Sequence, residues 1–138
     1  MDARKLSDDF SVSPQIDLRE VDEVVQAGFK SILCNRPDAE EYGQPDYDAV
    51  AKAAEGAGLE VRCVPIVSGM VTPQAAQDFA QALEEMPKPI LAYCRTGTRC
   101  TMLWSLVKYE DLGSDEILKA TQAAGYDMAG LLRQLQAR

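Results

Sequence analysis

The sequence predicts an α/β fold, a central parallel sheet of four to five strands flanked by helices. Short apolar runs alternate with segments of helical periodicity along the whole chain. Glycine or proline marks most of the junctions between them. The chain has 138 residues, of which 46% are hydrophobic, which is enough for one domain with a buried core. Strands separated by helices imply right-handed crossovers and a sheet covered on both faces. We therefore expect residues 1–138 to form a single domain.

The first predicted elements are a strand, a helix and a second strand. Residues 10–16 form an extended segment interrupted by a proline. Asp17 then starts a helix with a capping-box pattern. The apolar residues that recur at helical spacing in it are Leu18, Val21 and Val25. The apolar run 31–34 follows as a buried strand.

Strands and helices continue to alternate in the rest of the chain. The remaining predicted elements are a helix opened by Pro45, a strand over 59–66, a helix started by Thr72 and Pro73, a strand over 89–93, a helix ending near Gly113, and two helices capped by Ser114 and Asp127.

The segment from Tyr93 to Cys100 carries the strongest functional signal. An apolar strand leads to Cys94, a short loop with one glycine and two arginines follows, and a helical segment begins at once. Backbone N–H groups at a helix start, together with nearby arginines, favour a thiolate over a thiol. Gly97 can adopt a positive φ, which lets the loop curl with its N–H groups pointing inward. We therefore predict that Cys94 is an activated nucleophile in an anion-binding loop.

The other residues of this loop are candidates for substrate binding. Arg99 offers a planar fork of donors, and we expect it to bind an oxyanion beside the nucleophile. The backbone N–H groups expected to line the loop belong to Thr96, Gly97 and Thr98. Arg95 either points outward as a rim charge or takes part in binding. Cys100 is either a packed helix residue or a resolving thiol that captures oxidised Cys94 as a disulfide.

A second loop is expected at the same edge of the sheet. In parallel sheets the functional loops lie at the carboxyl ends of the strands, so loops 35–38, 66–70 and 94–99 would share one rim. Arg36 and Asp38 are therefore candidates for substrate binding, with an ion pair inside the loop as the alternative. Asp38 is also an acid that a phosphatase reaction could use.

Composition and charge argue against several function classes. The formal net charge is −8, with 22 acidic and 14 basic residues, which disfavours a nucleic-acid partner. The chain has no histidine, so a Ser-His-Asp triad and any His-ligated metal are excluded, and we expect no cofactor. No apolar run approaches the roughly 20 residues of a membrane span, and the N-terminus lacks the apolar stretch of a signal peptide. We expect a cytoplasmic protein that does not insert into membranes.

Four segments together resemble a known family. They are Val12–Gln15, Asn35–Asp38, Pro65–Gly69 and Cys94–Arg99. From Val12 to about Leu135 the chain resembles the small bacterial phosphatase-like domain called beta-lactamase hydrolase-like. The resemblance implies the fold of protein tyrosine and dual-specificity phosphatases. It also implies sulfur transfer, because many members are fused to persulfide dioxygenase or sulfide-oxidising flavoprotein domains, and such a protein would then be a partner.

Two features favour sulfur transfer over phosphate-ester hydrolysis. The phosphatase signature His-Cys-x-x-Gly-x-x-Arg is altered here, because Tyr93 replaces the histidine and Arg99 comes one residue early, at a spacing that resembles many single-domain rhodaneses. Ester cleavage also needs an acid on the leaving oxygen, yet residues 64–77 contain no Asp or Glu.

We therefore predict a rhodanese-type sulfurtransferase. Its donor would be a small sulfur anion or persulfide such as thiosulfate or glutathione persulfide, and its intermediate a persulfide on Cys94. Two alternatives stay open. One is a phosphatase that acts through a phosphocysteine, and the other is a non-catalytic anion or redox sensor.

Overall fold

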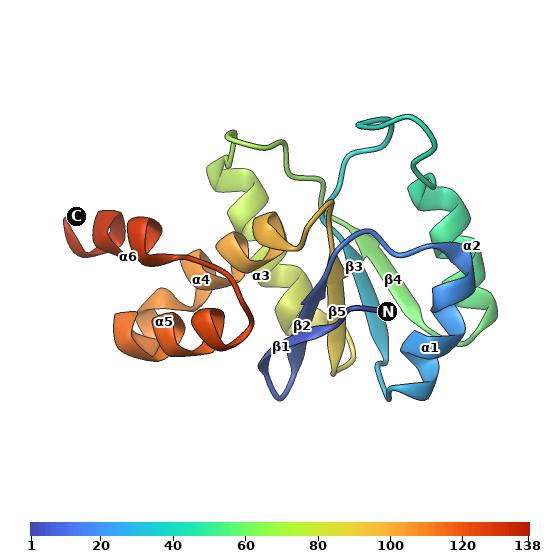
Figure 1. The fold of residues 1–138 in the computed structure, drawn as a ribbon, viewed down its shortest axis with the longest axis horizontal. Coiled ribbons are helices and arrows are strands. Elements are labelled where there is room, and N and C mark those ends of the chain that lie inside the picture. Colours follow the sequence, from blue (N-terminus) through green and yellow to red (C-terminus); the bar gives the residue numbers. More distant parts are fainter.

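The computed structural model describes residues 1–138 and contains a five-stranded sheet with helices on both faces (Figure 1). The strands are β1 (Arg4–Ser7), β2 (Phe10–Ser13), β3 (Ser31–Cys34), β4 (Glu60–Cys63) and β5 (Ile90–Tyr93). Their order in the sheet is β1-β2-β5-β3-β4. Four strands run parallel, and β1 alone is antiparallel to its neighbour β2. The sheet is therefore mixed, not wholly parallel as expected, because the two-residue turn between β1 and β2 leaves no room for a crossover helix.

Six α-helices and one 3₁₀ helix surround the sheet. They are η1 (Leu18–Glu20), α1 (Val21–Gln26), α2 (Tyr47–Gly56), α3 (Pro73–Glu85), α4 (Thr98–Leu112), α5 (Ser114–Ala123) and α6 (Ala129–Gln136). Figure 1 shows α1 and α2 on one side of the sheet and α3 and α4 on the other, with α5 and α6 packed beyond α4. None of these helices has the length and apolar character that a membrane crossing requires.

The central strand β5 sends alternate side chains into two different hydrophobic cores. Leu91 and Tyr93 pack on the side of α1 and α2, whereas Ile90, Ala92 and Cys94 belong to the core beneath α3 and α4. This is the two-residue period of a strand that is buried on both faces. As a result, the Cys94 thiol faces the start of α4.

The helix starts agree with the sequence in part. Asp17 forms the expected capping box, and the Thr72 hydroxyl accepts a hydrogen bond in the first turn of α3. Gly113 stands at the N-cap of α5, so the expected cap at Ser114 is wrong by one residue. Met128 stands at the N-cap of α6, one residue after the expected Asp127, whose carboxylate nevertheless accepts the Ala129 N–H.

The buried face of α1 differs from the predicted stripe. Val21 and Val24 are buried, whereas Leu18 and Val25 are 46% and 38% exposed. Leu18 lies in the 3₁₀ helix η1, which has about three residues per turn. Counting 3.6 residues per turn from Leu18 therefore predicts that Val25 is buried, whereas the structure buries Val24.

Candidate active site

The Cys94 loop (residues 94–97) joins β5 to α4 and curls around the cysteine sulfur. Gly97 has φ of 90°, which confirms the expected positive φ, and its N–H donates to Cys94 Sγ at 3.1 Å. The Thr101 hydroxyl donates to the Gly97 carbonyl at 2.8 Å, and the Tyr126 hydroxyl donates to the Thr96 carbonyl at 2.9 Å. The Thr96 and Gly97 N–H groups therefore face the sulfur, whereas the Thr98 N–H donates to the Thr96 hydroxyl at 3.4 Å.

The environment of Cys94 lowers the pKa of its thiol to about 5. The largest cause is a hydrogen bond from the Cys100 side chain, and backbone N–H groups of Cys100, Thr96 and Gly97 add to it. Burial opposes these contacts, since the Cys94 side chain has no exposed surface. At neutral pH the sulfur is therefore a thiolate, formed without any imidazole.

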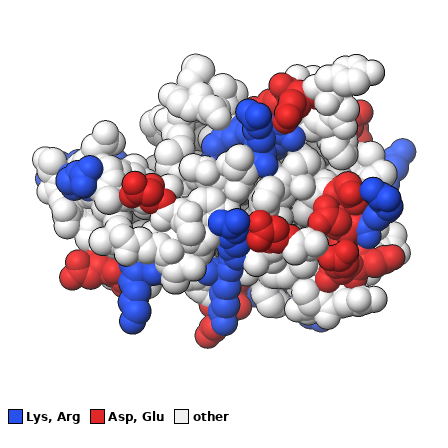
Figure 2. Space-filling model, in the orientation of Figure 1, with Lys and Arg blue, Asp and Glu red and all other residues white.

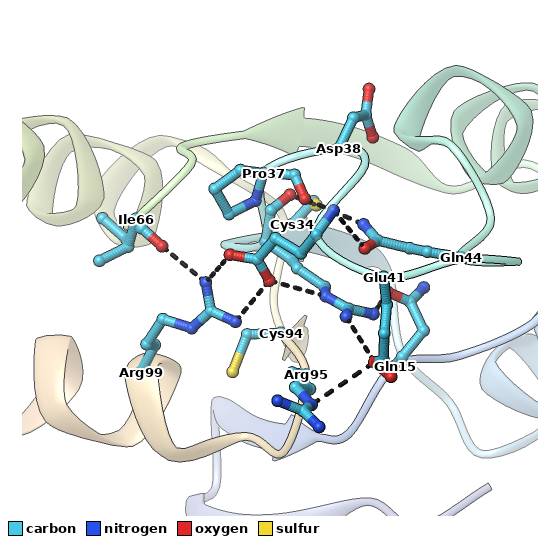
Figure 3. A network of polar contacts seen from close by, with 12 residues as sticks. Gln15, Cys34, Pro37, Asp38, Glu41, Gln44, Ile66, Cys94, Arg95 and Arg99 are labelled. Carbon is cyan, nitrogen blue, oxygen red and sulfur yellow. Dashed lines mark hydrogen bonds and ion pairs between the residues drawn. The ribbon is translucent and has the colours of Figure 1, made fainter. Parts of the chain in front are cut away.

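Arg99 is buried beside this sulfur, and one edge of its guanidinium is already bonded. Nη1 donates to Glu40 Oε2 at 2.7 Å and to the Ile66 carbonyl at 2.8 Å, and Nη2 donates to Glu40 Oε1 at 2.8 Å. Nε and the second hydrogen of Nη2 donate to no protein group, so this edge can bind an anion. Figure 3 shows Arg99 and Cys94 side by side. The contact with Ile66 confirms that the loops after β4 and β5 share one rim.

Glu40 links the two buried arginines. Its carboxylate accepts from Arg99 and, at 2.9 Å, from Nε of Arg36. The hydrogen bond from Arg99 is the main cause that lowers the pKa of Glu40 to about 2, with Arg36 adding to it. Arg36 also donates to Gln15 and Glu41, each at 3.0 Å. Arg36 thus forms the ion-pair network that was the alternative to substrate binding, and it reaches the site through Glu40.

Asp38 lies away from the nucleophile. Its Oδ1 accepts the backbone N–H of Tyr47 at 2.8 Å, at the start of α2. Figure 3 shows the Asp38 carboxylate pointing away from Cys94. The structure therefore does not bring Asp38 together with the loop residues that surround the sulfur.

The exposed residues of the Cys94 region form its rim. Arg95 is exposed, with Nε 3.5 Å from Glu41 Oε1, which matches the outward position expected for a rim charge. The hydroxyls of Thr96 and Thr98 hydrogen-bond to each other at 2.9 Å, so they are not directed at the thiolate.

All four cysteines are free thiols. Cys100 is completely buried in the first turn of α4, in the same core as Cys94. Cys34 and Cys63 lie opposite each other on β3 and β4 and pack in the other core. No group of three His, Cys, Asp or Glu side chains is arranged to bind a metal ion.

The surface near the site is locally less acidic than the chain as a whole. Three arginines, Arg36, Arg95 and Arg99, are paired with two glutamates, Glu40 and Glu41, which leaves one net positive charge among these five groups. Figure 2 shows basic and acidic side chains together at this upper edge of the molecule. Such a mixed cluster suits a small anion better than a polyanion.

Glu40 is a residue of the candidate site that the sequence did not reveal. Its only signal in the sequence is an acidic stretch, residues 38–41, that adjoins the predicted rim. The contact with Arg99 spans 59 residues of sequence and depends on the irregular loop after β3.

Comparisons with known proteins agree with this fold. Residues 2–110 match the family model described as beta-lactamase hydrolase-like protein, phosphatase-like domain. A beta-lactamase hydrolase-like protein of Xylella fastidiosa (strain 9a5c) is 31% identical over 133 residues, which are 95% of this chain and 31% of the relative. The chain therefore spans about a third of the length of the curated relatives it matches.

Solved structures extend the comparison. A proposed phosphatase from Neisseria meningitidis has 35% identity and a TM-score of 0.88, covering 100% of this chain and 99% of that one. Tk-PTP in its active form has 20% identity and a TM-score of 0.71, covering 99% of this chain and 97% of that one. The second likeness concerns the fold alone, and with the first it confirms the expected protein tyrosine phosphatase-like fold.

Proposed function

The chain belongs to the family of beta-lactamase hydrolase-like phosphatase-like domains, and from that premise we propose that it is a sulfurtransferase with Cys94 as nucleophile. One observation carries the proposal. A thiolate of low pKa, lined by backbone amides, lies beside a free guanidinium edge, while the neighbouring carboxylates already bind arginines or a backbone N–H. Such a site can bind an anion and attack it, but none of these carboxyl groups is placed to give a proton to a leaving oxygen.

Sulfur transfer needs no such proton. The free edge of Arg99 and the loop N–H groups bind the sulfonate oxygens of thiosulfate. The Cys94 thiolate attacks the outer sulfur, the S–S bond of thiosulfate breaks, and sulfite leaves with the electron pair. The product on the enzyme is Cys94–S–S⁻. Sulfite is a stable anion at neutral pH and needs no proton when it leaves. The step therefore fits a site in which Glu40, with a pKa of about 2, is ionised and cannot donate one.

Access to the sulfur requires movement. The Cys94 side chain has no exposed surface, so the surrounding loops must part before a donor can reach it. The loop after β3 carries Glu40, which bonds to Arg99, and its residues 35–46 lie outside any helix or strand.

A phosphatase is the second candidate, and the fold favours it. The structural relatives with the protein tyrosine phosphatase-like fold support a mechanism in which Cys94 attacks phosphorus and forms a phosphocysteine. Arg99 and the loop N–H groups would then bind the phosphate oxygens. This reaction needs a general acid, and Asp38, the acid that the sequence suggests, instead accepts the Tyr47 N–H at the start of α2.

A paired assay on the purified chain separates the candidates. One arm measures thiocyanate formed from cyanide with thiosulfate or glutathione persulfide, and the other measures hydrolysis of an aryl phosphate. We expect thiocyanate formation that is lost in Cys94→Ser and retained in Cys63→Ser, a cysteine on the opposite face of the sheet. Phosphate release without sulfur transfer would establish the phosphatase instead. Inactivity in both arms would favour the non-catalytic anion or redox sensor.

A further inference from the structure

A second thiol lies close to the site, and the transfer step described above makes and breaks no bond at it. Cys100 is entirely buried in the first turn of α4, in the same core as Cys94. The Gly97 N–H donates to Cys94 Sγ, and the Gly97 carbonyl accepts from the Thr101 hydroxyl, so the loop between the two cysteines is held in a tight curl. This curl brings both cysteine side chains into one core at the two ends of a short loop.

The other cysteines are not placed to take part. Cys34 and Cys63 pair across β3 and β4 and pack in the core on the opposite face of the sheet. Cys94 and Cys100 share the core beneath α3 and α4. Any thiol of the protein that meets a modified Cys94 is therefore Cys100, and Cys34 offers a matched control.

We propose that Cys100 is a resolving nucleophile that converts a persulfide on Cys94 into free sulfide and an internal disulfide. This inference rests on the proposed sulfurtransferase function. After sulfur transfer, Cys94 Sγ is the inner sulfur of Cys94–S–S⁻, and it lies in the core that Cys100 shares. If the Cys100 sulfur attacks Cys94 Sγ, the outer sulfur is released as sulfide. The site then carries out a second reaction after sulfur transfer.

The atoms and electrons of the step balance. The Cys100 sulfur bonds to Cys94 Sγ, the bond from Cys94 Sγ to the outer sulfur breaks, and the outer sulfur leaves with the electron pair. It takes the Cys100 proton and departs as HS⁻. Two thiols have been oxidised to one disulfide, and one sulfane sulfur has been reduced to sulfide. Two molecules of a low-molecular-weight thiol then reopen the disulfide and are themselves oxidised to a disulfide.

The electrostatics keep Cys100 inactive until sulfur arrives. Burial, followed by the interaction with Cys94, raises the pKa of Cys100. In the resting protein Cys100 is therefore protonated and does not compete with Cys94 for the donor. Loading places the negative charge on the outer sulfur, one bond farther away, which weakens the repulsion. The proton that Cys100 has kept is the one that the departing sulfide needs.

A single-turnover experiment tests this step. Reduced protein, freed of reductant, is mixed with excess thiosulfate, and sulfide, intact mass and disulfide-linked peptides are measured. We expect wild type to release stoichiometric sulfide and to form a Cys94–Cys100 disulfide. Cys100→Ser should instead retain one added sulfur on Cys94 and release at least roughly tenfold less sulfide, and Cys34→Ser should behave as wild type.

The outcomes separate this inference from the proposed function. A wild type that keeps its Cys94 persulfide and releases sulfide only after an external thiol is added overturns the resolving role but leaves sulfur transfer intact. Equal sulfide release by Cys100→Ser also overturns the role, as does a disulfide from Cys94 to Cys34. If neither wild type nor Cys100→Ser takes up sulfur, the sulfurtransferase itself fails and the inference fails with it. Peptide mapping of wild type distinguishes a Cys94–Cys100 disulfide from a retained persulfide even if the variant does not fold.

Discussion

Arg99 and Glu40 form a two-bonded ion pair beside the nucleophile, with N···O distances of 2.7 and 2.8 Å. The pair occupies the Nη1–Nη2 edge of the guanidinium and leaves the Nε edge available for a substrate anion. Glu40 therefore directs Arg99 without itself touching the substrate. This makes Glu40 a positioning residue, and its removal should affect binding of the anion more than the chemistry at sulfur.

Glu40→Gln tests this positioning role. The substitution preserves the shape of the side chain but removes a charge-assisted interaction of roughly 1.5–3 kcal/mol. We expect the KM for thiosulfate to rise about tenfold with a smaller change in kcat. Glu41→Gln is the matched control, because Glu41 bonds to Arg36 and lies near Arg95 but makes no bond to Arg99, and it should leave both constants nearly unchanged. Similar effects of the two substitutions would contradict the role.

The same ion pair should make stability depend on acid pH. The pKa of Glu40 is about 2 in the folded protein and 4.5 ordinarily, so its contribution is fully present above about pH 4.5 and is lost as the pH falls toward 2. Allowing for partial exposure to solvent, we expect about 2 kcal/mol at neutral pH. Urea unfolding of wild type and Glu40→Gln should show a gap in free energy at pH 7 that narrows below about pH 4. A gap that does not change with pH would show that the difference has another cause.

Cys100 should control the acidity of Cys94 through its hydrogen bond. Cys100→Ala removes the donor that is the largest cause of the low pKa, so we expect the pKa of Cys94 to rise from about 5 toward the ordinary 9.0. Cys100→Ser keeps a donor and should leave the pKa low. The thiolate absorbance in the ultraviolet, titrated against Cys94→Ser as the blank, measures both. Identical titrations of the alanine and serine variants would rule out this hydrogen bond.

The parts of the site that the sequence could predict are those built from adjacent residues. The apolar run before Cys94, the glycine three residues later and the helix that begins at once are local signals, and they place the thiolate loop correctly. Gly97 was informative because a positive φ is a backbone requirement that few other residues meet. The rim shared by three loops also followed, because parallel strands end at the same edge.

The parts that could not be predicted depend on irregular backbone. Strand β1 has no alternating apolar pattern, since only Leu6 among its four residues is buried, so its antiparallel pairing was missed. The 3₁₀ helix η1 has fewer residues per turn than an α-helix, so the predicted buried face included Val25, which is exposed in the structure. Glu40 reaches Arg99 from a loop without periodicity, and only the folded backbone brings the two together.

The curl of the Cys94 loop should depend on a close approach to Tyr126. A Cβ at position 97 would clash with the Tyr126 hydroxyl oxygen, and φ there is +90°. We expect Gly97→Ala to cost roughly 2–3 kcal/mol and to raise the pKa of Cys94 by displacing an N–H donor. Gly58→Ala has the same φ of +90° but no atom within 4 Å of the added Cβ, and it should cost only about 1 kcal/mol. Combining Gly97→Ala with Tyr126→Phe should recover part of the difference, and no recovery would show that the clash is not the cause.

Asp38 provides the sharpest test between the two chemistries. In a phosphatase that used Asp38 as general acid, Asp38→Asn would remove the proton donor and lower kcat by about 10²–10⁴-fold. In the structure the Asp38 carboxylate accepts the Tyr47 N–H at the start of α2, whose N-cap is Asp46, and the amide oxygen of asparagine can accept the same hydrogen bond. We therefore expect Asp38→Asn to fold with nearly unchanged stability and to transfer sulfur at the wild-type rate, whereas Asp38→Ala should lose about 1 kcal/mol with the same transfer rate. A large loss of phosphatase turnover in Asp38→Asn at unchanged stability would contradict this expectation. It would mean that the loop after β3 rearranges to present the Asp38 carboxylate to the leaving group, and it would favour ester hydrolysis.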